Sequence, residues 1–290
     1  MKRIAPVQGL TLLFFAGLIL LVLLFQGQIP LWRSLILRYS LCLGLLVALT
    51  VSRNRGIAGR TGNFFHDFSP ILFIVLIYES LGDVIQYLRP DIDSVLIQID
   101  LFLFGVHPTV WIERWIVPWL TDSLSLAYIS YYFLPVILAV TLYLKGKLSD
   151  FDLAMFVLAF GYYVSFIGYV LFPAIGPRYT LTNLQSVPLK ASFITDFVRD
   201  LLNAAEHNKR DCMPSGHTQI ALMILYLAYR YERVLFYLLL PVVCALILST
   251  VYLRYHYVID LLAGAATALF SITVAPRIYR YWNRKYENKV

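Results

Sequence analysis

The feature that most constrains the fold is a succession of apolar runs, most of them close to the ~20 residues that a helix needs to cross a bilayer. Of all residues, 60% are hydrophobic and only 14% are charged, whereas soluble domains have about a quarter charged. We therefore predict an all-α integral membrane protein with about eight transmembrane helices. The apolar runs lie at about 8–26, 31–51, 70–88, 123–144, 152–172, 218–229, 234–253 and 257–275.

The formal net charge of +7 comes from basic residues that are distributed by membrane side. They are not gathered into a groove that would bind nucleic acid. If both termini lie on one side, the basic residues gather there, and the positive-inside rule makes that side cytoplasmic. The sequence thus predicts a multi-pass protein with two cytoplasmic termini and no nucleic-acid partner. The residues collected on this side are Lys2, Arg3, Arg53, Arg55, Arg60, Lys145, Lys147, Arg230, Arg233, Arg277, Arg280, Arg284, Lys285 and Lys289.

A basic, glycine-bearing loop at 51–62 is the candidate domain boundary. It divides the chain into an N-terminal transmembrane hairpin with its basic loop (1–62), a catalytic membrane domain (63–276) and a basic cytoplasmic tail (277–290). The catalytic domain is expected to be a six-helix core. The hairpin carries almost no chemistry.

Polar, reactive residues stand immediately before the sixth apolar run, in the stretch 211–218. Pro214 and Ser215 are helix-start signals. The first amides of a helix lack partners and lie at the positive end of its dipole, which favours an anion. Ser215 can donate a hydroxyl, Gly216 lets backbone N–H groups approach an oxyanion, and His217 can protonate a leaving oxygen. Phosphate fits this arrangement best.

Two further stretches complete the pattern. His256 and Asp260 are four residues apart and share one helix face, so the carboxylate can orient the imidazole and leave its other nitrogen free as a nucleophile. A Pro/Gly-broken segment at 172–178 presents Arg178, whose guanidinium matches phosphate geometry. All three stretches fall on the face opposite the predicted cytoplasmic one, at a periplasmic, extracellular or lumenal surface.

In these residues the chain resembles the type 2 phosphatidic acid phosphatase superfamily, whose members form a phosphohistidine without a metal or cofactor. The resemblance implies that His256 is the nucleophile, Asp260 its orienting partner and His217 the acid/base. It also implies that Arg178, Ser215 and Gly216 form the phosphate cradle. An alternative of a different kind is a zinc or manganese site using His217, His256 and Asp260.

The first and third motifs depart from the superfamily pattern. Leu171 and Tyr179 stand where a lysine and a proline are usual, and Ser249-Thr250 stands where Ser-Arg is usual. Arg254 is the nearest substitute for that arginine as a phosphate ligand. With these departures the chain looks more like the aureobasidin-resistance-type inositol phosphorylceramide synthase branch, which transfers head groups between lipids.

Glu79 and Asp83 lie four residues apart in the third apolar run. Ionised groups are expensive in a membrane and are functional candidates there. We expect one of them to bind head-group hydroxyls or to pair with Arg178 or Arg254. The structural alternative is a salt bridge to Arg89 or a helix-capping contact.

Two long connections complete the sequence-based description. The stretch 90–122 contains a short apolar run and spaced tryptophans, which predicts amphipathic helices covering the site from the outer surface. The segment between Arg178 and Asp211 is the longest polar one and is expected to act as a lid or binding loop.

The sequence therefore predicts a membrane lipid phosphotransferase that moves a phospho-head group, with phosphoinositol as the candidate, from a phospholipid to a lipid hydroxyl. A lipid phosphate or polyprenyl diphosphate phosphatase using the same site is the alternative. A lipid transporter or an inactive scaffold is the non-enzymatic one. The expected partners in each case are membrane lipids.

Overall fold

A computed structural model describes residues 4–189, 195–200 and 208–287. In this part of the chain all regular elements are helices. They are α1 (Pro6–Leu24), α2 (Trp32–Asn54), α3 (Gly59–Ile85), α4 (Asp93–Phe104), α5 (Pro108–Trp111), η1 (Ile112–Trp115), α6 (Pro118–Ile129), η2 (Ser130–Tyr132), α7 (Leu134–Leu144), α8 (Leu148–Leu171), α9 (Pro177–Thr180), α11 (Gly216–Tyr231), α12 (Arg233–Tyr252) and α13 (Val258–Glu287).

Six of these helices are long and apolar enough to cross a membrane: α1, α2, α3, α8, α12 and α13. Two bent pairs, α4 with α5–η1 and α6–η2 with α7, bring the number to as many as eight. The all-α multi-pass class is therefore confirmed. One of the expected spans is short. Helix α11 begins inside the motif, as its sequence allowed, but it has only 16 residues, which make about 24 Å of helix.

The segment 123–144 forms no single straight helix. The chain bends by 52° between α6–η2 and α7. Three residues take a 3₁₀ turn at the bend, and Pro135 lies in the first turn of α7. A proline lacks the N–H that would continue the hydrogen bonds of a preceding helix, so the bend falls just before it.

Helix α8 lies at the centre of the bundle and contacts α1, α3, α7, α11 and α13. Its buried residues belong to one hydrophobic cluster that also includes buried residues of α1 and α2. The hairpin adds polar contacts: Tyr39 hydrogen-bonds with Ser80 at 2.8 Å, and Thr11 with Tyr163 at 2.9 Å. The proposed boundary after residue 62 falls inside α3, which begins at Gly59, and the division remains a prediction.

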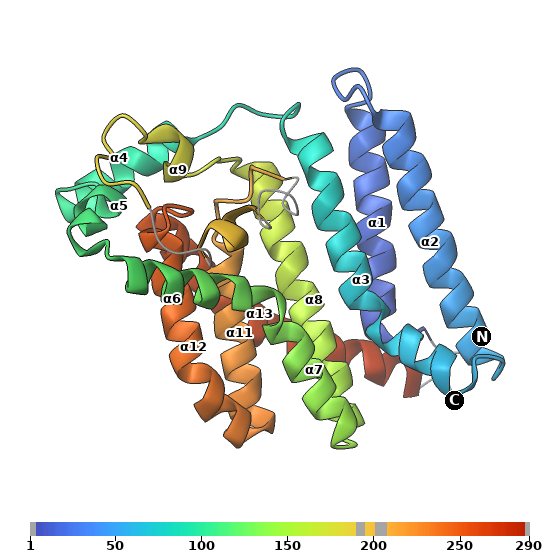
Figure 1. The fold of residues 1–290 in the computed structure, drawn as a ribbon. Coiled ribbons are helices and arrows are strands. Elements are labelled where there is room, and N and C mark those ends of the chain that lie inside the picture. Colours follow the sequence, from blue (N-terminus) through green and yellow to red (C-terminus); the bar gives the residue numbers. More distant parts are fainter. Residues whose placement is uncertain (1–3, 190–194, 201–207, 288–290) are drawn as a thin grey trace.

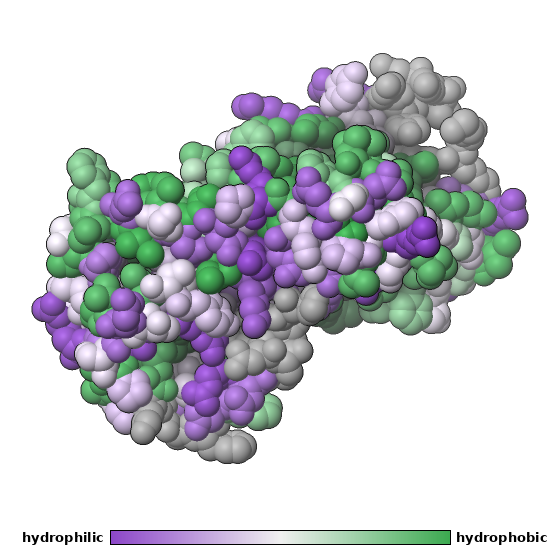
Figure 2. Space-filling view, turned by 90° about the horizontal axis from the view of Figure 1, so that it is seen from above, coloured by the Kyte–Doolittle hydropathy of each residue, from purple (hydrophilic) through white to green (hydrophobic). Residues whose placement is uncertain are grey.

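The motif loops and the chain termini lie at different ends of the bundle. Helices α4, α5 and α9 lie at the upper end in Figure 1, whereas the chain termini lie together at the lower end. A view onto the upper end shows hydrophilic residues gathered along the middle of this face between apolar patches (Figure 2). This polar face is where the site is found.

Candidate functional site

The start of α11 is built by close packing against its neighbours. Ser215 is the N-cap residue, and its hydroxyl accepts from the amide of Thr218 at 3.3 Å. A Cβ on Gly216 would collide with the Tyr169 hydroxyl. A Cβ on Gly264 of α13 would lie 2.5 Å from the Ser215 carbonyl oxygen. These glycines let α8 and α13 approach the motif, which fixes the position of the next residue, His217.

The third stretch is a tight turn after α12. The carbonyl of Thr250 accepts from the amides of Tyr255 at 2.9 Å and His256 at 3.0 Å. Arg254 has a φ of 68°, in the left-handed region that non-glycine residues rarely occupy. The turn brings His256 next to Cys212 and opposite His217.

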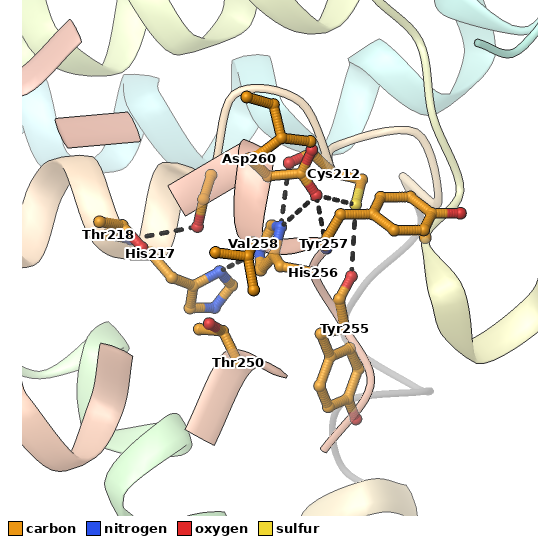
Figure 3. A network of polar contacts seen from close by, with 12 residues as sticks. Cys212, His217, Thr218, Thr250, Tyr255, His256, Tyr257, Val258 and Asp260 are labelled. Atoms are coloured by element: carbon orange, nitrogen blue, oxygen red, sulfur yellow. Dashed lines mark hydrogen bonds and ion pairs between the residues drawn. The ribbon is translucent and has the colours of Figure 1, made fainter. Parts of the chain in front are cut away.

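His217 and His256 face each other at the centre of the site (Figure 3). Nε2 of His256 lies 3.4 Å from Nδ1 of His217, and both side chains are buried. The rings of Tyr128 and Tyr131 pack on His217 with centroid distances of 4.4 and 4.2 Å. Among the described residues, Nε2 of His217 has no hydrogen-bond partner. The two imidazoles can therefore act on one group bound beside them.

The partner that orients His256 differs from the expected one. Its Nδ1 lies 2.9 Å from the carbonyl oxygen of Cys212 and 3.6 Å from Oδ2 of Asp260. A carbonyl only accepts, so Nδ1 carries the proton and donates to Cys212. Nε2 of His256 is left as a lone-pair nitrogen pointing at His217, as a nucleophile requires. Asp260 acts as a nearby charge and not as the direct acceptor.

Asp260 is itself buried and holds the surrounding backbone. Its Oδ2 accepts from the amide of Tyr257 and from the thiol of Cys212, both at 2.8 Å. The carbonyl of Asp260 accepts from the amide of Ser215 at 3.0 Å. It therefore connects the second and third motifs.

Within the described residues, one group of potential metal ligands comprises Cys212, His256 and Asp260, whose ligating atoms lie within 4.8 Å of one another. It differs from the expected metal set, since Cys212 takes the place of His217. The set of His217, His256 and Asp260 that the metal alternative needs is therefore not brought together among the described residues. Burial, with Asp260 beside the sulfur, raises the pKa of the Cys212 thiol well above its usual range.

A polar cavity of about 340 Å³ opens beside His256. Arg178 lies on its wall and donates to the Tyr255 hydroxyl at 3.1 Å. Lys209 lines the same cavity and was not singled out from the sequence, although it stands two residues before the second motif. The cavity thus has two cationic side chains, Arg178 and Lys209. The superfamily pattern has a lysine at the position of Leu171, and Lys209 supplies a positive charge that this position lacks.

An apolar cavity of about 270 Å³ lies on the other side of the histidine pair, between α3, α7 and α8. His217 lines this cavity, whereas His256 lines the polar one. Asp211 lines both. The two histidines therefore separate a cation-bearing space from an apolar one.

Asp211 accepts from the Tyr78 hydroxyl at 2.6 Å. Burial raises the pKa of Asp211 above its usual value, while the Tyr78 hydrogen bond and the nearby His256 act in the opposite direction. A carboxyl that is more readily neutral repels an anion in the adjoining cavity less.

Other expected site residues lie away from the polar cavity. The Arg254 guanidinium is buried and paired with Glu113 at 2.7 Å. Asp83 faces Arg38 of α2 at 3.8 Å. This partner is neither Arg178 or Arg254, the functional expectation, nor Arg89, the structural one. Glu79 lines the apolar cavity. Parts of the expected lid, 190–194 and 201–207, lie outside the described residues.

Comparison with known proteins agrees with this geometry. A family model described as the PAP2 superfamily matches residues 95–274, more than half of the chain. The chain belongs to the PAP2 superfamily. A PA-phosphatase related-family protein of Dictyostelium discoideum is 27% identical over an alignment of 173 residues, which covers 52% of this chain and 31% of that protein. The chain thus matches less than a third of the relative's length. No solved structure matches it.

The PAP2 match contains all three motifs, and it also contains most of α4, which the sequence predicted only as part of an amphipathic cover over the site. Asp100 of α4 is buried and accepts from the amides of Val258 at 2.8 Å and Ile259 at 2.9 Å. These are the first amides of α13. Asp100 therefore caps the helix that carries Asp260.

Asp93, at the start of α4, acts in the same way on the first motif. Its carboxylate accepts from the amides of Ile175 at 3.0 Å and Gly176 at 2.8 Å, and from the Tyr257 hydroxyl at 2.9 Å. At Gly176, φ is 88°, a conformation that glycine adopts at little cost. Asp93 thus holds the loop before Arg178 against the loop after His256. The available signal was the presence of Asp93 and Asp100, seven residues and so about two turns apart, in an otherwise mostly apolar helix; it marks these residues but not their partners.

Proposed function

We propose that this PAP2 protein is a lipid phosphotransferase that works through a phosphohistidine on His256. In this proposal a phospho-head group, with phosphoinositol as the candidate, passes from a phospholipid to a lipid hydroxyl. The observation that carries the proposal is the position of His256 and His217 between a polar cavity with two cations and an apolar cavity. A transferase needs room for a charged donor head group and for an apolar acceptor at the same pair of groups.

In the first step, the donor phosphodiester binds in the polar cavity beside Arg178 and Lys209. The lone pair on Nε2 of His256 attacks phosphorus, and a new N–P bond forms as the P–O bond to the leaving alcohol breaks. Burial and the nearby His256 lower the pKa of His217, so in this proposal His217 is protonated only when the anionic phosphate lies beside it. It then gives its proton to the leaving oxygen. The Cys212 carbonyl and the Asp260 carboxylate stabilise the positive charge on the His256 ring.

In the second step, His217 takes the proton of an acceptor hydroxyl that enters from the apolar cavity. The acceptor oxygen attacks phosphorus, the N–P bond breaks, and both histidines return to their starting states. Nε2 of His217 is buried and has no partner among the described residues, which supports its availability for proton exchange.

Hydrolysis is the second candidate, with water in place of the acceptor. It is favoured by the pair of cations at the polar cavity, because a phosphomonoester carries more charge than a phosphodiester. The relative's description as PA-phosphatase related is consistent with it. We further propose that both termini are cytoplasmic and that the site faces the periplasmic, extracellular or lumenal side.

The test uses purified protein in detergent with mass-spectrometric detection of products. One reaction contains phosphatidylinositol with ceramide or diacylglycerol. Others contain phosphatidic acid or a polyprenyl diphosphate. A new phospholipid supports transfer, and free phosphate supports hydrolysis. His256→Ala should lower either rate by about a thousandfold or more, as removal of a nucleophile does.

His107→Ala is the matched control, because it removes a histidine that lines neither cavity. It should keep most of the activity. Equal rates for His256→Ala and wild type would refute the enzyme proposal, and unchanged lipid flux in that variant would favour a transporter. Product formation that continues without an acid-labile phosphoryl label on the protein would refute the phosphohistidine.

A further inference from the structure

A third cavity, with a different character, lies at the end of the bundle opposite to the histidines. It has a volume of about 370 Å³ and lies between α8, α11 and α13. Its walls include Leu153, Val157 and Ile272. Arg230 belongs to the last turn of α11, about 20 Å along the helix from His217. This cavity is therefore separate from the proposed catalytic site.

Three arginines line this cavity: Arg230, Arg277 and Arg280. All three are exposed, and its lining contains no carboxylate among the described residues. In the same part of the chain these arginines form no ion pair, whereas Arg53 and Arg254 both do. The cavity therefore combines a concentrated positive charge with apolar walls.

The arginines also lie at the depth of a bilayer surface. Arg277 is about 28 Å along α13 from Val258, at 1.5 Å per residue, close to the ~30 Å thickness of a hydrocarbon core. Tyr226 and Tyr231 line the same cavity, and tyrosines favour the membrane–water interface. If α13 enters the bilayer near Val258, the guanidinium groups lie at the level of lipid head groups and the walls at the level of acyl chains.

We propose that this cavity binds one anionic phospholipid from the membrane leaflet opposite to the histidine site. The lipid phosphate lies among Arg230, Arg277 and Arg280, because guanidinium groups bind phosphate oxygens in a bidentate manner. One acyl chain lies along Leu153, Val157 and Ile272. Basic pockets between transmembrane helices are known to take such head groups. The proposal does not depend on the reaction at the histidines.

The test is native mass spectrometry of the full chain, released from detergent and titrated with phosphatidylserine or phosphatidylcholine. Wild type should bind one phosphatidylserine more tightly than phosphatidylcholine. Each Arg→Gln change at 230, 277 or 280 should weaken phosphatidylserine binding about fivefold, since one basic residue near an anionic surface contributes about 1 kcal/mol. Arg277→Lys with Arg280→Lys keeps both charges but loses the bidentate geometry, so it should retain only part of the preference for the anionic lipid.

Arg233→Gln is the matched control. Arg233 is the first residue of α12, and its guanidinium lies over the Tyr229 ring, 3.7 Å from the centroid. It does not line the cavity, so the affinity should be unchanged. Equal binding of the two lipids would overturn the proposal. An equal loss in Arg233→Gln would also overturn it, because the effect would then be one of general surface charge. Competition by inorganic phosphate at the same concentration as the lipid would overturn the assignment to a phospholipid.

Discussion

Ion pairs at the two ends of the bundle differ in burial and in what they hold. At the motif end, Arg254 and Glu113 pair with side chains only 9% and 6% exposed. At the opposite end, Glu232 pairs with Lys145 and Lys147, whose side chains are 51% and 38% exposed. The buried pair also ties together three segments distant in sequence. At the other end Glu232 is itself only 9% exposed, and Lys147 also donates to the Tyr231 carbonyl at 2.6 Å. The comparison indicates that both partners are enclosed at the motif end, whereas the lysines at the other end stay exposed.

The largest expected effect comes from breaking the buried pair. Glu113→Gln removes a carboxylate that binds Arg254 and also accepts from the amides of Ser186 and Val187. Arg254 would then be a buried charge without its counter-ion. The free energy of unfolding should fall by about 3–5 kcal/mol, as it does when one partner of a buried pair is lost. Thermal or denaturant unfolding in detergent measures this change.

Two further variants sharpen this test. Glu113→Gln combined with Arg254→Gln should recover part of the loss, because the buried charge is gone. Asp67→Asn, which breaks the exposed pair with Arg53, should cost less than about 1 kcal/mol. If Asp67→Asn destabilises the protein as much as Glu113→Gln, the proposed difference between buried and exposed pairs is wrong.

A smaller effect is expected at Asp100, the carboxylate that caps α13. Asp100→Asn keeps the shape and one acceptor oxygen, but its amide nitrogen then faces one of the two backbone donors, and a negative charge is removed from a helix start. A loss of about 1–3 kcal/mol follows from one unsatisfied buried group. If the proposed reaction holds, kcat should fall while KM changes little, because Asp100 positions Asp260 and not the substrate. Gln98→Ala, at an exposed site on α4, is the control, and an equal effect there would contradict this role.

Asp100 also illustrates what the sequence could and could not predict. Apolar runs of membrane length predicted most of the long helices, and local patterns predicted His217, His256 and Asp260 as site residues, because both signals lie within a few residues. Asp100 meets α13 across 158 residues of chain, and Glu113 meets Arg254 across 141. Such pairings depend on tertiary packing and leave no local pattern. The bend before α7 was visible as Pro135, but its 52° angle depends on the neighbouring helices.

A more modest effect is expected at Lys209, which is exposed at the polar cavity. Lys209→Gln should raise the KM for an anionic lipid about fivefold, since two unit charges about 4 Å apart in water interact by about 1 kcal/mol. Lys209→Arg should keep the wild-type value. Kinetics at two salt concentrations check the cause, because screening should reduce the difference. A salt-independent change would point to a structural effect on the loop instead.

The smallest effect is expected at the opposite end, in Glu232. The hydrogen bonds and charges of Lys145 and Lys147 lower the pKa of Glu232 below its usual value, so its contribution to stability is present above the unfolded-state pKa and is lost as the pH falls through the lower, folded-state pKa. Glu232→Gln should cost less than about 1 kcal/mol at neutral pH, because both lysines are exposed. Unfolding measured against pH should show the variant and wild type converging in acid. A difference in unfolding free energy that persists at low pH would mean that Glu232 stabilises this end through packing. The two ends of the bundle would then differ in their packing contacts and not in their charges.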